Sequence, residues 1–112
     1  MIKVPMICVN PVYSVEDKIV GTEYLDAQIY VEDCDDPIEY WLTEVTSIIN
    51  KRKSIILYRQ DVRAFADKVG GKDAFREIKI KLRERYSVLK LKYNPRTQEF
   101  CGMKTAFIIH KR

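Results

Sequence analysis

The clearest pattern of apolar and polar positions in the chain lies between Lys72 and Tyr86. At about 100° per residue, its apolar side chains fall on one face of a helix, at spacings of three and four. Four cations share the adjacent face, and the residue types in the stretch favour helix over strand. The apolar positions are Phe75, Ile78, Leu82 and Tyr86, and the basic positions are Lys72, Arg76, Lys79 and Arg83. The pattern therefore predicts an amphipathic helix with a basic face.

A strand is the alternative for the same stretch. Ile78, Ile80 and Leu82 alternate strictly with polar residues, as the residues of a half-buried strand do. This interpretation accounts for Ile80, which a helix places between a basic and an acidic stripe. The sequence favours the helix and leaves the strand open.

Apolar runs elsewhere predict strands, separated by turn residues. Ser54–Tyr58 is a continuous apolar run, which is typical of a central strand buried on both faces. Pro5 indicates an edge position for the first strand, because proline donates no hydrogen bond to a sheet. Turns are predicted at Asn10–Pro11 and at 94–97. The predicted strands are Ile2–Val9, Lys18–Val20, Tyr24–Glu32, Ser54–Tyr58, Ser87–Tyr93 and Phe100–Ile109.

Two further helices are predicted from their end signals. Asp36 suits an N-cap, followed by Pro37 at the first helical position and by Glu39, which is expected to reach back to the cap. This helix runs to about Asn50, with the single tryptophan in its apolar stripe. A second helix covers about 60–69, and Gly70–Gly71 ends it.

Together these elements predict one α+β domain that spans residues 1–112. We expect a mostly antiparallel sheet of about five or six strands, with two or three helices packed on one face. The expected order is β-β-β-α-β-α-α-β-β.

Composition and cysteine spacing indicate a cytoplasmic protein without a cofactor. No apolar run approaches the roughly 18 residues of a membrane span, and the N-terminus lacks the features of a signal peptide. The three cysteines are odd in number and far apart, which argues against a disulfide framework or a zinc site. The acidic run Glu32–Asp36 has the oxygen ligands of a hard cation, but not EF-hand spacing, and part of it caps a helix. We therefore expect no metal site.

Charge is divided unequally along the chain. Residues 1–50 hold two cations and ten acids, a net charge of −8, and residues 51–112 hold 18 cations and six acids, a net charge of +12. Such asymmetry indicates a polyanionic partner for the second half. Two alternatives stay open, because the halves can neutralise each other within one chain or associate head to tail between chains.

The main hypothesis is a small, non-catalytic protein that binds nucleic acid, DNA or RNA, through phosphate contacts of its basic half. Aromatic residues near the cations would stack on bases. The candidate nucleic-acid-binding residues are Lys51, Arg52, Lys53, Arg59, Arg63, Lys72, Arg76, Lys79, Arg83, Lys90, Lys92 and Arg96, with Tyr86, Tyr93 or Phe100 for stacking.

Two other functions remain as alternatives. The first is a protein-interaction module, an adaptor or inhibitor, whose dipolar surface and exposed Tyr24 and Tyr30 would contact a protein partner. The second is a metal-dependent nuclease. Glu77 and Lys79 have the acid-x-lysine spacing of such sites, provided that they lie on a strand and that Asp61 or Asp67 completes the metal site.

Overall fold

The computed structural model describes residues 1–52, 54–94 and 99–112, and the side chains within these ranges except those of residues 93–103. The described part contains five strands and three helices. They are β1 (Ile2–Tyr13), β2 (Ile19–Val31), α1 (Pro37–Lys51), β3 (Ser54–Tyr58), α2 (Arg59–Val69), α3 (Lys72–Arg85), β4 (Tyr86–Asn94) and β5 (Glu99–Lys111).

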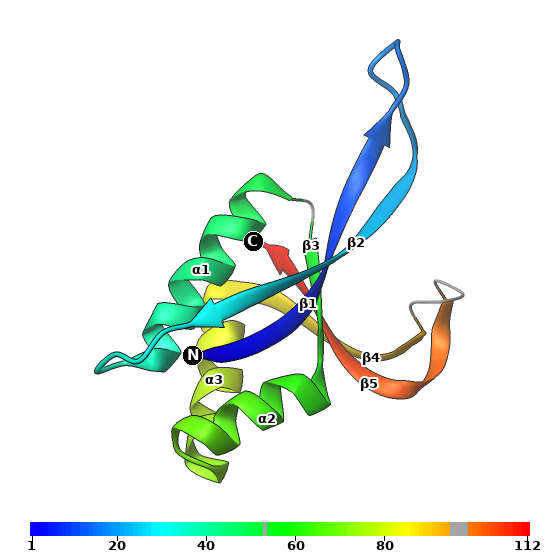
Figure 1. Ribbon diagram of the computed structural model, residues 1–112. Helices are drawn as coiled ribbons and strands as arrows, with labels where there is room; N and C mark the ends of the chain where they lie inside the picture. Colours follow the sequence, from blue (N-terminus) through cyan, green and yellow to red (C-terminus); the bar gives the residue numbers. More distant parts are fainter. Residues whose placement is uncertain (53, 95–98) are drawn as a thin grey trace.

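The strands form one antiparallel sheet in the order β2-β1-β3-β5-β4. All three helices lie together on one side of this sheet (Figure 1). The other side, here called the open face, carries no helix. The α+β class and the placement of the helices on one face are thus confirmed.

The short strand β3 joins two long hairpins into this sheet. It pairs with β1 through Ile7–Val9 and with β5 along its whole length. Ile55 and Leu57 are buried beneath the helices, while Ile56 is buried on the open face. The continuous apolar run therefore forms the central strand that the sequence predicts.

The number of strands before α1 was predicted wrongly, and so was the edge position of the first strand, because β1 lies between β2 and β3. The turn expected at Asn10–Pro11 is absent, and the two strands expected after it form the single strand β2. The chain reverses later, where the Ser14 hydroxyl accepts hydrogen bonds from the backbone N–H groups of Glu16 and Lys18. Proline is tolerated inside β1 because Pro5 and Pro11 lie on either side of the three residues that pair with β3.

The cap of α1 follows the prediction only in part. The Asp36 carboxylate accepts a hydrogen bond from the Glu39 N–H at 3.1 Å, as an N-cap should. The Glu39 side chain does not reach back to the cap. It binds Arg85 instead, 46 residues along the chain. A tertiary ion pair has replaced the second half of the local capping box.

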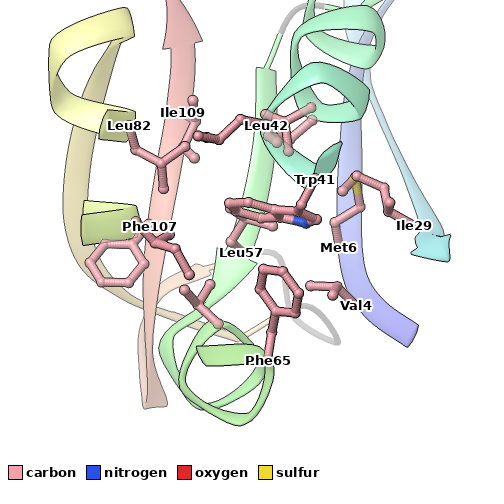
Figure 2. Packing of buried hydrophobic residues seen from close by; sticks show 14 of the residues in the cluster. Val4, Met6, Ile29, Trp41, Leu42, Leu57, Phe65, Leu82, Phe107 and Ile109 are labelled. Atoms are coloured by element: carbon pink, nitrogen blue, oxygen red, sulfur yellow. The ribbon is translucent and has the colours of Figure 1, made fainter. Parts of the chain in front are cut away.

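The main core lies between the helices and the sheet. Trp41 of α1 is fully buried, and its ring centroid lies 5.5 Å from that of Phe65 of α2. Figure 2 shows Trp41 among Met6 and Leu57 of the sheet. The sole tryptophan therefore belongs to the core, as predicted.

No helix in the described part of the chain is long and apolar enough to cross a membrane.

Two glycines provide a matched test of the turn between α2 and α3. Gly71 has φ +77° and ψ −143°, a conformation that is essentially confined to glycine. Gly71→Ala should lower the free energy of unfolding by about 1–3 kcal/mol, measured by chemical denaturation. Gly21→Ala is the control, because a methyl group there meets no atom within 4 Å. Equal losses in both variants would contradict the role of the Gly71 conformation.

Candidate nucleic-acid interface

The stretch from Lys72 to Arg85 is a helix, so the strand alternative is wrong. Ala74, Phe75, Ile78 and Leu82 are buried on its inner side, and Ile80, the residue that fits the helix poorly, is exposed. Packing of the inner side against the core decides the conformation.

The helix also separates the two residues of the acid-x-lysine pair. Glu77 forms an ion pair with Lys81 at 3.3 Å, whereas the Lys79 ammonium lies over the Phe75 ring. A strand would have placed both side chains on one face, as a shared metal site requires. The arrangement that motivated the nuclease alternative is therefore absent.

One side of α3 faces α1 and is neutralised by it. The Glu39 carboxylate lies 3.0 Å from Arg85 Nη2 and 3.8 Å from Lys81 Nζ. Glu39 belongs to the acidic half of the chain, so the two halves do meet within one molecule. This contact lies on one side of α3, and the cations on the other side of the helix are not paired with Glu39.

The other side of α3 faces α2, and three cations gather there over one aromatic ring. The guanidinium carbons of Arg59 and Arg63 each lie 5.2 Å from the centroid of the Phe75 ring, and Lys79 Nζ lies 4.5 Å from it. Phe75 is itself buried, so its ring forms the floor beneath these charges. Cation–π attraction holds the cations in place despite their mutual repulsion.

The electrostatic environment of Lys79 shows that more cations are near. Partial burial lowers the pKa of Lys79 below its ordinary value, and Arg83, Arg59, Lys90 and Arg76 lower it further. These residues come from α2, α3 and β4. Arg63, which also lies over the Phe75 ring, completes the group. We call these six residues the basic cluster: Arg59, Arg63, Arg76, Lys79, Arg83 and Lys90.

Most of the basic cluster forms no ion pair among the described residues. Arg63 is paired with Asp67 on its own helix at 3.3 Å. The other five cations form no ion pair with any residue that the structure describes. Because like charges repel, the cluster costs folding free energy, and an anion bound there would relieve this cost.

The remaining predicted residues lie apart from the cluster or outside the described residues. Lys51 and Arg52 line a different cleft, of about 550 Å³, between the end of α1 and the β1–β2 hairpin. Lys72 and Lys92 are exposed, but neither is among the cations that lower the pKa of Lys79. Lys53 and Arg96, together with the side chains of Tyr93 and Phe100, lie outside the described part.

Tyr86, one of the rings that the sequence offers for stacking on a base, is buried. Its side chain is only 6% exposed, and its hydroxyl is hydrogen-bonded to the Thr46 hydroxyl of α1. Tyr86 lies at the junction of α3 and β4, where the chain turns back beneath the helix layer. Its ring therefore stabilises the packing of α1 against this junction and presents no face to a ligand.

A groove that the sequence did not predict lies on the open face of the sheet. This groove, here called the open-face groove, has a volume of about 350 Å³ and is lined by residues of all five strands. Val9, Ile56 and Ile108 are buried along it, and Leu89 and Leu91 remain partly exposed beside them. The alternation of leucine and lysine in β4 was the available signal, because it places two leucines on the face away from the helices.

No three histidine, cysteine, aspartate or glutamate side chains gather as metal ligands among the described residues. In particular, the acidic run before α1 does not close around a common centre.

Comparisons of the chain with protein-family models, with curated proteins and with solved structures found no match.

The crowding of charge around Lys79 predicts a stabilising substitution. The lowered pKa means that the native state holds the Lys79 proton less tightly than the unfolded chain does, so the charge costs stability at neutral pH. Lys79→Met keeps the aliphatic cover over Phe75 and should raise Tm by about 1–3 °C at low salt. The gain should fade at high salt, and as the pH rises through the lowered pKa, because the wild-type lysine then loses its charge.

Lys81→Met is the matched control for this substitution. Lys81 has Glu39 and Glu77 as partners, so its removal should leave Tm unchanged or lower it. Thermal unfolding of both variants at two salt concentrations makes the comparison. A lower Tm for Lys79→Met at low salt would show that the crowding is not unfavourable.

Proposed function

We propose that this protein binds nucleic acid, DNA or RNA, through phosphate contacts of the basic cluster and without catalysis. The observation that carries the proposal is the crowding of cations around Lys79, which lack acidic partners among the described residues. A polyanion supplies the missing negative charge, and its binding releases counterions from the phosphate backbone.

The composition and spacing of the cluster suit phosphates. Four of its six members are arginines, whose planar guanidinium groups bind phosphate oxygens in a bidentate manner. Arg76 and Arg83 are seven residues apart on α3, so their backbone positions are separated by roughly 10 Å along the helix. Arg59 and Lys90 widen the cluster to either side of α3. A surface of this size supports contact with several phosphates.

The expected binding depends little on base sequence. The Phe75 ring is covered by three cations, and Tyr86 is buried, so neither ring is open to a base. Contacts to the phosphate backbone position a nucleic acid but carry no sequence information. We therefore infer an affinity that is governed by charge and salt.

A protein-interaction module is the second candidate, and the open-face groove is the observation that favours it. Its apolar lining resembles the centre of a protein interface more than a phosphate site. Lys90 lies opposite Phe107, on the helix side of the sheet, whereas the groove lies on the other side. The two functions would therefore use separate surfaces and do not exclude each other.

Two double variants of α3 test the nucleic-acid proposal. Lys79→Gln with Arg83→Gln removes two members of the basic cluster, and Lys81→Gln with Arg85→Gln removes the same charges from the neutralised side of the same helix. Binding of labelled single- and double-stranded oligonucleotides is measured by fluorescence anisotropy over a range of salt. The first variant should bind more weakly, with a log–log salt slope reduced by about one per removed cation, and the second should bind like the wild type.

Equal weakening by both variants would mean that only net charge matters, and it would count against a site on the basic cluster. An absence of wild-type binding at low salt, with both strand types, would rule the proposal out. Circular dichroism of each variant verifies that the comparison is made between folded proteins.

A further inference from the structure

The cleft between the end of α1 and the β1–β2 hairpin exists because β3 is short. Ser54, the first residue of β3, pairs with Val9 of β1. Beyond Val9 the hairpin continues without a third strand, and Figure 1 shows it extending past the rest of the sheet. The last turn of α1 and this part of the hairpin form the two walls of the cleft, whose volume of about 550 Å³ is typical of a site for a small ligand.

A buried amide faces the cleft from the hairpin wall. Asn10 lines the cleft, yet its side chain is only 8% exposed. Alternation along β1 places it on the helix side of the sheet, the side of Met6 and Cys8. The Asn10 side chain forms no hydrogen bond with any residue that the structure describes. A buried amide costs free energy unless it is hydrogen-bonded, so this one suits a ligand that offers both a donor and an acceptor.

Two neighbours of this amide on the hairpin wall suit a nucleobase. Glu23 is the cross-strand partner of Asn10, so its side chain lies on the same side of the sheet, and it forms no ion pair with a described residue. Tyr13 also lines the cleft and is 58% exposed. Asparagine amides and carboxylates hydrogen-bond the edges of bases, and exposed tyrosine rings stack on them.

The opposite wall, at the end of α1, is basic. Lys51 and Arg52 line it, and neither forms an ion pair with any residue that the structure describes. Burial raises the pKa of the Cys8 thiol, and the charge of Arg52 partly opposes this rise, so Arg52 lies close to β1. These cations also complement the negative end of α1, so by themselves they indicate no ligand. Across the cleft from the Asn10 amide, they provide contacts for a phosphate.

We propose that this cleft binds a nucleotide whose base carries an amino group, with its phosphate on Lys51 and Arg52 and its base against Tyr13, Asn10 and Glu23. The proposal goes beyond nucleic-acid binding by the basic cluster, because the cleft and the cluster share no residue. A free mononucleotide and the phosphorylated end of a strand offer the same chemistry to the cleft, and competition between them identifies the source.

The first test compares three small phosphates by calorimetry on the full chain at low salt. Adenosine 5′-monophosphate should bind and saturate one site. Uridine 5′-monophosphate, whose base has no amino group, and ribose 5-phosphate, which has no base, should each bind at least about tenfold more weakly. Equal affinities for the adenosine compound and ribose 5-phosphate overturn the proposal, as does an absence of binding by the adenosine compound.

A charge-matched pair of variants tests the phosphate wall. Lys51→Gln with Arg52→Gln should weaken binding of adenosine 5′-monophosphate by at least about tenfold. Lys72→Gln with Lys92→Gln removes the same charge from exposed residues that do not line the cleft, and it should leave this affinity unchanged. Equal weakening by both double variants would mean that net charge alone attracts the nucleotide, which overturns the proposal.

The hairpin wall is tested by single substitutions. Asn10→Ala removes the buried amide and should weaken binding about three- to tenfold. Because Asn10 is buried, the exposed Tyr13 provides a second variant that leaves the packing intact, and Tyr13→Ala should weaken binding at least about fivefold. Tyr30→Ala is its control, on an exposed part of β2 that does not line the cleft. Equal affinities of the Tyr13 and Tyr30 variants overturn the proposal.

The variant Lys79→Gln with Arg83→Gln separates this site from the basic cluster. It should bind adenosine 5′-monophosphate as the wild type does, and a loss of binding would place the nucleotide on the cluster and overturn the proposal. On this variant, competition by a 5′-phosphorylated oligonucleotide identifies the end of a strand as the ligand, and an absence of competition identifies a free nucleotide. Failure of the cleft to bind a nucleotide leaves oligonucleotide binding by the basic cluster untouched.

Discussion

The burial of β3 on both faces is the constraint from which the other features follow. This five-residue strand has helices on one side and the satellite apolar cluster around Ile56 on the other. It holds only three residues of β1, yet it pairs with β5 along its whole length. The two outer hairpins are therefore tied to the centre over a short distance, and their ends lie beyond the cover of the helices. Both the exposed end of the β1–β2 hairpin and the open-face groove arise from this mismatch between long hairpins and a short centre.

Much of the fold followed from local pattern. The central strand, the three helices and the cap at Asp36 were all predicted, because each depends on residues that are neighbours in sequence. The break expected at Asn10–Pro11 failed for a reason that is not local. Whether a proline interrupts a strand depends on which residues of that strand are paired with a neighbour. In β1, the residues that pair with β3 are Ile7–Val9, which lie between Pro5 and Pro11. Sequence pattern carries no information on that pairing.

The candidate site shows the same limit. The basic residues of α3 were identified by their periodicity, but their partners lie on other elements. Glu39 forms ion pairs with Lys81 and with Arg85, which is 46 residues away, so these two cations do not belong to the basic cluster. The α2 cations reach Phe75 because the two glycines between α2 and α3 reverse the chain. Tyr86 was taken as a surface ring because it continues the apolar face of α3 at the end of a charged helix. Its burial against Thr46 depends on where α1 packs.

The position of β4 at the edge of the sheet gives its lysines a second consequence. An edge strand presents unpaired backbone groups, and a strand with alternating leucines would otherwise add readily to the edge of another sheet. Lys90 and Lys92 alternate with Leu89 and Leu91, so each added strand would bring ammonium groups together at close spacing. Both lysines thereby oppose fibril-like growth of the sheet. A change in the charge of this edge therefore also changes the tendency of the chain to aggregate.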